Sequence, residues 1–184
     1  MKIADVDIFF LPGLGGSSQD HWQSRWAAKM ANGQIIAQDD WHKPQKDRWV
    51  DTVVRAVEEA QRPVVLVGHS VGVLTAVHAA PHFRPGQVVG AFLVGVSDWE
   101  RPKLAEIAGD HGFAPIPRTR LPFPSHLMAS RNDPTCDFDK SEDLAAAWGA
   151  SLGDAQDAGH FEVESGHGPW PEGLMSFASF MRSL

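Results

Sequence analysis

Residues 63–72 constrain the fold more strongly than any other part of the chain. An unbroken apolar run, Val-Val-Leu-Val, leads into Gly-His-Ser-Val-Gly, and the helix-compatible residues 73–80 follow. A strand that turns sharply into a helix at Gly-x-Ser-x-Gly is the nucleophile-elbow pattern, in which the glycines let strand and helix approach without Cβ clashes. The pattern therefore predicts a strained turn that exposes the Ser70 hydroxyl above the edge of a sheet. The alternative is an ordinary glycine-rich turn in which Ser70 only caps the helix.

The rest of the chain alternates strand-like and helical patterns. Apolar runs at residues 8–11, 35–37, 88–94 and 125–130 are typical of strands, and a short last strand is expected within residues 151–158. Helical spacing separates these runs, beginning with a helix that Ser17 or Ser18 can cap and ending with one that starts at Pro171. We expect an α/β fold with a mostly parallel sheet of about six strands and helices on both faces.

Size and composition fit a single globular domain over residues 1–184. The chain has 43% hydrophobic and 21% charged residues. Its net charge of −7 and its scattered basic residues argue against a nucleic-acid partner, which would need clustered Lys and Arg. No signal-peptide pattern opens the chain, and no apolar run approaches the roughly 20 residues that span a bilayer. We expect a cytoplasmic protein without a membrane partner.

The loop at residues 12–16, Pro-Gly-Leu-Gly-Gly, follows the first strand. It matches neither a dinucleotide-binding fingerprint nor a P-loop, so a phosphate site is not expected. In a hydrolase sheet this loop supplies one oxyanion donor, and the residue after the nucleophile supplies the other. Pro12 has no N–H, which leaves Gly13, Leu14 or Gly15. We predict the N–H groups of Leu14 and Val71 as the oxyanion hole.

A serine nucleophile needs a base and an acid that orients the base. In this fold class the chain order is serine, acid, histidine. The sequence offers Ser70 after the third strand, Asp133 after the fifth and His160 after the last, each at the carboxyl end of its strand. We therefore predict these three residues as the catalytic triad.

Other residues compete for the same roles. Asp137 and Asp139 are alternatives for the acid, and His167 is an alternative for the base. His160 is preferred because it follows the expected strand directly, whereas His167 lies closer to the final helix. Cys136, the only cysteine, lies among acidic residues that would raise its thiol pKa, so it is a poor nucleophile.

The long segment at residues 97–124 contains five prolines around one weak helical stretch at 103–109. Loops of this length in compact domains are usually functional, so we assign it to the mouth of the substrate site. Trp99 and Phe123 are candidate walls of that site, although core packing fits both equally well.

A metal site is not expected. Asp39, Asp40 and His42 lie close together in the sequence, but adjacent side chains alternate in direction and no further ligand group recurs at suitable spacing. The pattern favours a solvated loop. Triad chemistry requires neither a metal nor an organic cofactor.

Four motifs together resemble one family. They are Gly-His-Ser-Val-Gly, Ser-Arg-Asn-Asp-Pro at residues 130–134, Gly-His-Phe at 159–161, and Gly-His-Gly-Pro-Trp-Pro at 166–171. The chain resembles the small α/β-hydrolase-fold serine hydrolases related to retinoblastoma-binding protein nine. The resemblance implies a compact α/β-hydrolase fold without a large cap domain, and a triad that matches Ser70, Asp133 and His160.

The resemblance also implies that Trp170 and Pro171 belong to a family signature, and we count Trp170 as a third candidate substrate contact. The namesake's partner is thought to be bound through Leu-x-Cys-x-Glu, which this sequence lacks, so a retinoblastoma-type partner is not expected. The predicted function is cleavage of small ester or related acyl substrates through an acyl-enzyme. The alternative is a binding module on a hydrolase scaffold.

Overall fold

The computed structural model describes residues 2–102, 104 and 111–184. Its centre is one sheet with strand order β2-β1-β3-β4-β5-β6, in which every neighbouring pair is parallel. The strands are β1 (Asp7–Leu11), β2 (Gly33–Ile35), β3 (Val64–His69), β4 (Val88–Val94), β5 (Ser125–Ala129) and β6 (Ser151–Asp154). All their carboxyl ends therefore lie along one edge of the sheet.

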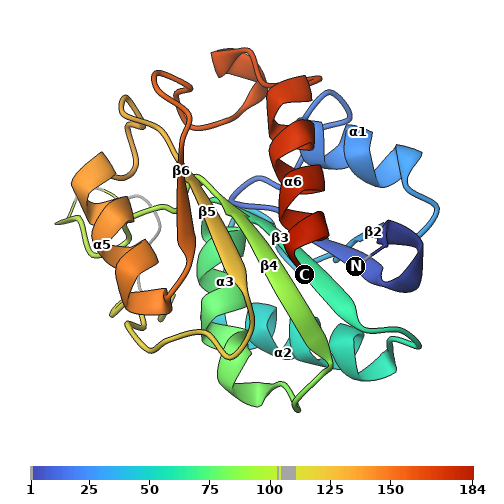
Figure 1. Ribbon diagram of the computed structural model, residues 1–184. Helices are drawn as coiled ribbons and strands as arrows, with labels where there is room; N and C mark the ends of the chain where they lie inside the picture. Colours follow the sequence, from blue (N-terminus) through green and yellow to red (C-terminus); the bar gives the residue numbers. More distant parts are fainter. Residues whose placement is uncertain (1, 103, 105–110) are drawn as a thin grey trace.

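Helices cover both faces of the sheet (Figure 1), as the sequence predicts. One face is covered by α1 and α6, and the other by α2, α3 and α5. The helices are α1 (Trp22–Lys29), α2 (Lys46–Glu59), α3 (Val71–Ala79), α5 (Phe138–Trp148) and α6 (Pro171–Ser183). Single 3-10 turns lie at η1 (Ile3–Asp5), η2 (Ala80–His82) and η3 (Val163–Ser165).

Alternate side chains of the central strands enter two separate cores. On β4, Phe92 and Val94 pack with the residues of α1 and α6, whereas Ala91 and Leu93 pack with those of α2, α3 and α5. Because both faces are covered, a central strand must be apolar at every position, which explains the continuous apolar run of β3.

The start of α1 differs from the sequence expectation, because neither Ser17 nor Ser18 caps it. The helix begins at Trp22, and its N-cap is His21, whose Nδ1 accepts the N–H of Gln23 at 3.2 Å. Ser17 instead donates its hydroxyl to the Gln23 side chain at 2.8 Å, and the carbonyl of Ser18 accepts the N–H of His21. The serines are therefore used within the turn that precedes the helix.

The strand expected at residues 35–37 lies at Gly33–Ile35, because its pairing with β1 begins opposite Ile8. The weak helical stretch expected at 103–109 lies, apart from Leu104, outside the described residues. Among the described residues, no helix is both long and apolar enough to cross a membrane.

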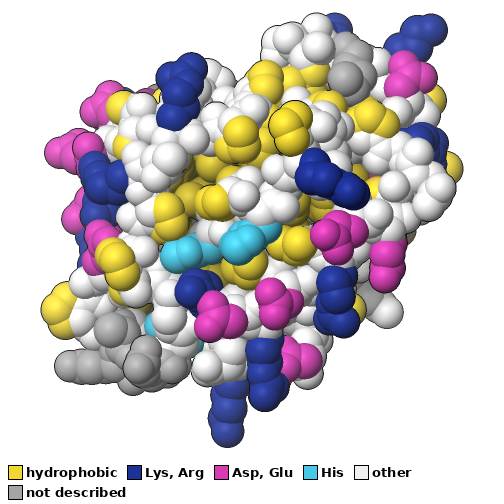
Figure 2. All heavy atoms as spheres, turned by 90° about the horizontal axis from the view of Figure 1, so that it is seen from below, with side chains coloured by type: hydrophobic (Ala, Val, Ile, Leu, Met, Phe, Trp, Pro, Cys, Tyr) yellow, Lys and Arg dark blue, Asp and Glu magenta, His cyan; other side chains and the backbone are white. Residues whose placement is uncertain are grey.

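Distant parts of the chain meet above the carboxyl edge of the sheet. The indole N–H of Trp22 donates to the carbonyl of Phe161 at 3.0 Å, which joins the start of α1 to the loop after β6. The opposite end of the molecule is seen in Figure 2, where hydrophobic side chains occupy the centre and acidic and basic side chains are interspersed around them. Among the residues that the structure describes, this face therefore carries no cluster of one charge.

The corner between β3 and α3 is packed so closely that only glycine fits at Gly72. A Cβ at this position would overlap the carbonyl oxygen of Leu11 and approach that of Pro12 to 2.8 Å. Both obstacles are backbone atoms, so they cannot rotate away. The glycine therefore fixes how closely α3 approaches the end of β1.

We expect Gly72→Ala to lower the free energy of unfolding by more than about 3 kcal/mol, above the usual range for an overpacked site. The matched control is Gly86→Ala, where nothing lies within 4 Å and only the positive φ of +84° resists a side chain. That control should lose about 1–2 kcal/mol. Urea denaturation measures both losses of stability. Equal losses would contradict the conclusion that the packing of α3 against β1 excludes a side chain at Gly72.

Candidate active site

Ser70 occupies the sharp corner between β3 and α3 that the sequence predicts. Its backbone has φ 56° and ψ −122°, a conformation that non-glycine residues avoid. The residue is 8% exposed. The turn therefore holds the hydroxyl at the carboxyl edge of the sheet in a mostly dry environment.

The structure brings Ser70, His160 and Asp133 into one chain of hydrogen bonds. Ser70 Oγ lies 2.9 Å from His160 Nε2, and His160 Nδ1 lies 2.8 Å from Asp133 Oδ2. The side chains of His160 and Asp133 are 8% and 3% exposed. A carboxylate can only accept, so Nδ1–H donates to Asp133 and leaves Nε2 free to accept the Ser70 proton. This is the arrangement that activates a serine for attack.

Thr135 holds Asp133 in place, a role that the sequence did not predict. Asp133 Oδ1 accepts both the N–H and the hydroxyl of Thr135, each at 2.8 Å. An Asp followed two residues later by a hydroxyl residue at a strand end is typical of such a turn, so the signal was present. Both carboxylate oxygens of Asp133 are therefore engaged.

Ser97, in the loop after β4, was also missed. Its Oγ lies 2.8 Å from Ser70 Oγ, and the residue is 3% exposed. Because the single hydroxyl proton of Ser70 is directed to His160, Ser97 must be the donor in this bond. The next residue, Asp98, donates its N–H to the carbonyl of Thr135 at 3.1 Å, which ties the loops after β4 and β5 together.

Buried polar side chains form hydrogen bonds with the backbone next to the site. His69 Nε2 lies 2.8 Å from the carbonyl oxygen of His160, to which it donates. Burial lowers the pKa of His69 well below 6.5, so this donor is neutral. The Gln23 amide donates to the carbonyls of Leu11 and Val67 at 3.2 and 3.1 Å and so joins the ends of β1 and β3.

The glycine-rich loop after β1 faces Ser70. The N–H of Gly15 is bound to the carbonyl of Trp41 at 2.8 Å, so that group is not available to a substrate. Gly13 and Leu14 remain from the predicted set of loop donors. Val71 opens α3, and the first N–H groups of a helix have no intrahelical acceptor. These placements are compatible with the predicted Leu14 and Val71 oxyanion donors.

A pocket of about 220 Å³ lies beside the hydroxyl of Ser70. It is lined by residues 13–16, by Ser18, His21 and His69, by Ser70 and His160, and by residues 162–164. Leu14 and Val163, which are 42% and 37% exposed, give its lining an apolar part. The volume suits a small acyl group rather than a long chain.

The three candidate substrate contacts do not line this pocket. Trp99 packs against Phe113 with ring centroids 5.4 Å apart, and Phe123 belongs to the same buried core. Trp170 stacks on Trp26 at 5.8 Å in the core on the other face. Each is less than a tenth exposed, so the structure places them in core packing.

The competing residues are engaged elsewhere. Asp137 forms an ion pair with Arg101, and Asp139 is exposed in the first turn of α5. His167 lies within hydrogen-bonding distance of a neighbouring serine hydroxyl at 3.2 Å. Burial raises the pKa of Cys136 to about 11, so this residue is a protonated thiol at neutral pH.

The acidic side chains at residues 39 and 40 bind partners within the protein. Asp39 pairs with Arg48 at 2.9 Å, and Asp40 accepts the N–H groups of His42 and Lys43 at 2.8 and 3.1 Å. Within residues 2–102, 104 and 111–184, no group of three His, Cys, Asp or Glu could hold a metal ion.

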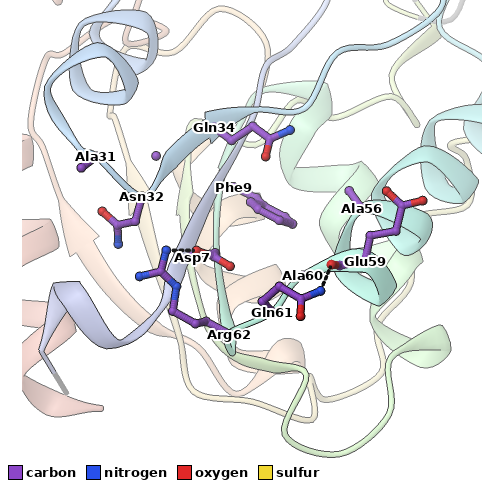
Figure 3. A pocket seen from close by; sticks show the side chains of 11 residues that line it. Asp7, Phe9, Ala31, Asn32, Gln34, Ala56, Glu59, Ala60, Gln61 and Arg62 are labelled. Atoms are coloured by element: carbon purple, nitrogen blue, oxygen red, sulfur yellow. Dashed lines mark hydrogen bonds and ion pairs between the residues drawn. The ribbon is translucent and has the colours of Figure 1, made fainter.

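Figure 3 shows a second pocket, of about 410 Å³, between β1, β2 and the end of α2. Arg62 and Asp7 form an ion pair at 2.8 Å in its wall. Asp7 begins β1 and Arg62 precedes β3, so this pocket lies toward the amino ends of the strands, away from the carboxyl edge that carries Ser70. None of the described residues that line it is a serine, cysteine or histidine.

A parallel sheet flanked by helices, with a serine at the strand–helix corner and a histidine–carboxylate pair beside it, defines an α/β-hydrolase. The chain belongs to the serine hydrolase family, which it matches over residues 8–179. No curated protein matches the sequence. The narrower resemblance to relatives of retinoblastoma-binding protein nine stays a prediction.

Solved structures agree with this assignment. A putative YdeN-like hydrolase from Pectobacterium atrosepticum is 33% identical, with 96% of this chain and 91% of that chain covered and a TM-score of 0.84. The YdeN gene product of B. subtilis is 24% identical, with 96% and 99% covered and a TM-score of 0.74. A butyrate-bound esterase from Thermogutta terrifontis is 19% identical, with 100% and 85% covered and a TM-score of 0.68. The last two show the fold alone.

The buried histidines predict how stability depends on pH. Burial, and secondarily the charge of His160, lowers the pKa of His21 from 6.5 to about 4. Between these pH values the unfolded chain binds more protons than the folded chain, so stability falls as the pH is lowered from 6.5 to 4. His21 should contribute a loss of about 3 kcal/mol. The Asn side chain of His21→Asn can still cap α1 but does not titrate in this range. Its free energy of unfolding should therefore decrease by about 3 kcal/mol less than that of the wild type between pH 6.5 and 4. Urea denaturation at several pH values measures it, and an unchanged pH dependence would contradict the assignment.

Proposed function

We propose that this serine hydrolase cleaves small esters or related acyl compounds through an acyl-enzyme, with Ser70 as nucleophile, His160 as base and Asp133 as the group that orients the base. The observation that carries the proposal is the hydrogen-bonded chain from Ser70 Oγ through both nitrogens of His160 to Asp133. It supplies the base and the orienting acid that a serine hydroxyl needs at neutral pH.

The reaction has two halves. Ser70 attacks the acyl carbonyl while His160 Nε2 takes the hydroxyl proton, and the imidazolium then gives that proton to the leaving group. The oxyanion is received by the N–H groups of Leu14 and Val71, and losing such a donor typically costs about 10²- to 10³-fold in rate. Water attacks the acyl-enzyme with His160 again as base, which releases the acid and restores Ser70. His160 must start this sequence with Nε2 unprotonated, because only then can that nitrogen accept the hydroxyl proton.

The pocket supports a small ester as substrate. Its volume of about 220 Å³ and its partly apolar lining suit a short acyl or alkyl group. A thioesterase, amidase or peptidase would use the same three residues and is the nearest alternative. A binding module that keeps an idle triad is the alternative from another class. The enzymes require a reactive Ser70 hydroxyl, whereas a binding module with an idle triad does not, so a test of Ser70 reactivity distinguishes these alternatives.

We expect a fluorophosphonate probe to label the wild type once per chain and to leave Ser70→Ala unlabelled, because only an activated serine attacks the phosphorus atom. Intact-protein mass spectrometry measures the adduct. Circular dichroism of both proteins provides the control for folding. A folded wild type that takes no label would favour the binding module, and a labelled Ser70→Ala would place the nucleophile elsewhere.

Ser97 should assist the nucleophile. Its hydroxyl donates to Ser70 Oγ, and a hydrogen bond to an oxygen that gains negative charge is stronger than one to a neutral oxygen. We expect Ser97→Ala to lower kcat about five- to tenfold with little change in KM. Ser97→Thr, which keeps a hydroxyl, should recover part of the loss. Equal kcat values for Ser97→Ala and wild type with p-nitrophenyl butyrate would rule out this role.

A further inference from the structure

His21 lines the pocket beside Ser70, and the mechanism above does not use it. The side chain comes from the N-cap of α1 and is enclosed, since the residue is 5% exposed. It lies in the same small pocket as Ser70 and His160. Its ring centroid is 4.9 Å from that of His69, which is in turn 5.0 Å from that of His160. His21 is therefore a buried polar group within reach of a bound substrate.

The hydrogen bonds of His21 fix where its proton lies. Nδ1 accepts the N–H of Gln23 at 3.2 Å, so in the neutral ring the proton is on Nε2. Burial keeps the ring neutral, since it lowers the pKa of His21 to about 4. Among the described residues, Nε2 has no hydrogen-bond partner, and it is not one of the fully enclosed polar atoms. An N–H donor therefore faces the pocket without an acceptor.

Two side-chain donors next to His21 are already engaged. His69 donates its Nε2–H to the carbonyl of His160, and the Gln23 amide is bound to the carbonyls of Leu11 and Val67. Because Nε2–H is open to the pocket, water accepts it in the free protein, and a substrate oxygen placed there would replace that water. His21 is placed to meet that acceptor.

The charges of the pocket indicate what kind of acceptor it is. Glu162 and Glu164 line the pocket, and no Lys or Arg is among the described residues that do so. Carboxylates beside the site repel an anionic substrate, and a neutral imidazole offers no compensating charge. An uncharged oxygen acceptor, such as an ether, hydroxyl or second carbonyl oxygen, fits both observations.

We propose that the pocket selects uncharged acyl substrates that carry a second oxygen acceptor near the scissile carbonyl, and that His21 Nε2–H donates to this oxygen. The proposal rests on the proposed ester hydrolysis and adds to it a substrate class and a residue that recognises it. His21 touches the substrate but takes no part in proton transfer to or from Ser70.

The test uses two pairs of esters in which an oxygen replaces a methylene. On the acyl side the pair is p-nitrophenyl methoxyacetate and p-nitrophenyl butyrate. On the alcohol side it is 2-methoxyethyl acetate and butyl acetate. For each pair, kcat/KM of the ether is divided by that of the alkyl ester, and this ratio is compared between wild type and variants, which cancels the intrinsic reactivity of each ester.

Two substitutions distinguish the role of His21 Nδ1 as the cap of α1 from the proposed role of Nε2–H as a donor to the substrate. His21→Asn can keep the acceptor that caps α1 but has no group at the position of Nε2. His21→Gln places an amide N–H near that position but loses the cap. For at least one pair, we expect the ratio to fall about five- to tenfold in His21→Asn and to be largely retained in His21→Gln. Measured unfolding of both variants shows whether each is folded under assay conditions.

Unchanged ratios in folded His21→Asn for both pairs would overturn the proposal. So would a fall that His21→Gln shares in full, since the cap would then be the cause. If wild type hydrolyses none of the esters and takes no fluorophosphonate, the proposed function itself fails. Turnover of all four esters without dependence on His21 defeats only the present inference.

The charge preference is tested separately. We expect p-nitrophenyl hexanoate to be cleaved with about tenfold higher kcat/KM than the mono-p-nitrophenyl ester of adipic acid, which carries a carboxylate at the same chain length. Glu164→Gln should narrow that difference, and so should added salt. Equal kcat/KM values for the two esters, or a higher value for the anionic ester, would overturn the proposal that the pocket selects uncharged substrates.

Discussion

The close approach of α3 to the end of β1 is the constraint on which the site depends. It requires Gly72, and it is matched by Gly13, where a Cβ would lie 2.6 Å from that of Ser70. The loop after β1 is therefore in van der Waals contact with the nucleophile. The unfavourable backbone of Ser70 persists because packing on both sides leaves it no other conformation.

Asp133 and His160, the proposed acid and base, are positioned by hydrogen bonds between loops rather than by the strands alone. Asn132 Oδ1 accepts the N–H of Gly159 at 2.6 Å, so the residues next to Asp133 and His160 are joined directly. The carbonyl of Gln156 accepts the N–H of Arg131 at 2.7 Å. Each loop is held at more than one point, which limits movement of the hydrogen-bonded pair. Such preorganisation is what a general base requires.

The sequence predicted what depends on periodicity and order. A strand buried on both faces reads as an apolar run, and the end of β3 locates Ser70. His160 follows β6, which is short and partly exposed, so chain order rather than an apolar run located it. The sequence did not predict the contacts of Ser97, which lies 27 residues from Ser70 and reaches it only through the parallel pairing of β3 and β4. The sequence also could not show whether Trp99 packs in the core or lines the substrate pocket, because aromatic residues in both places have the same local sequence pattern.

The hydrogen bond from Trp22 to the carbonyl of Phe161 has a consequence for biosynthesis. The two residues lie 139 positions apart, and each adjoins a residue of the pocket, His21 and His160. While the ribosome is still making the chain, the elbow serine emerges about 90 residues before its base. The proposed nucleophile thus leaves the ribosome without the imidazole that would activate it, and the hydrogen-bonded chain can form only after synthesis has passed His160.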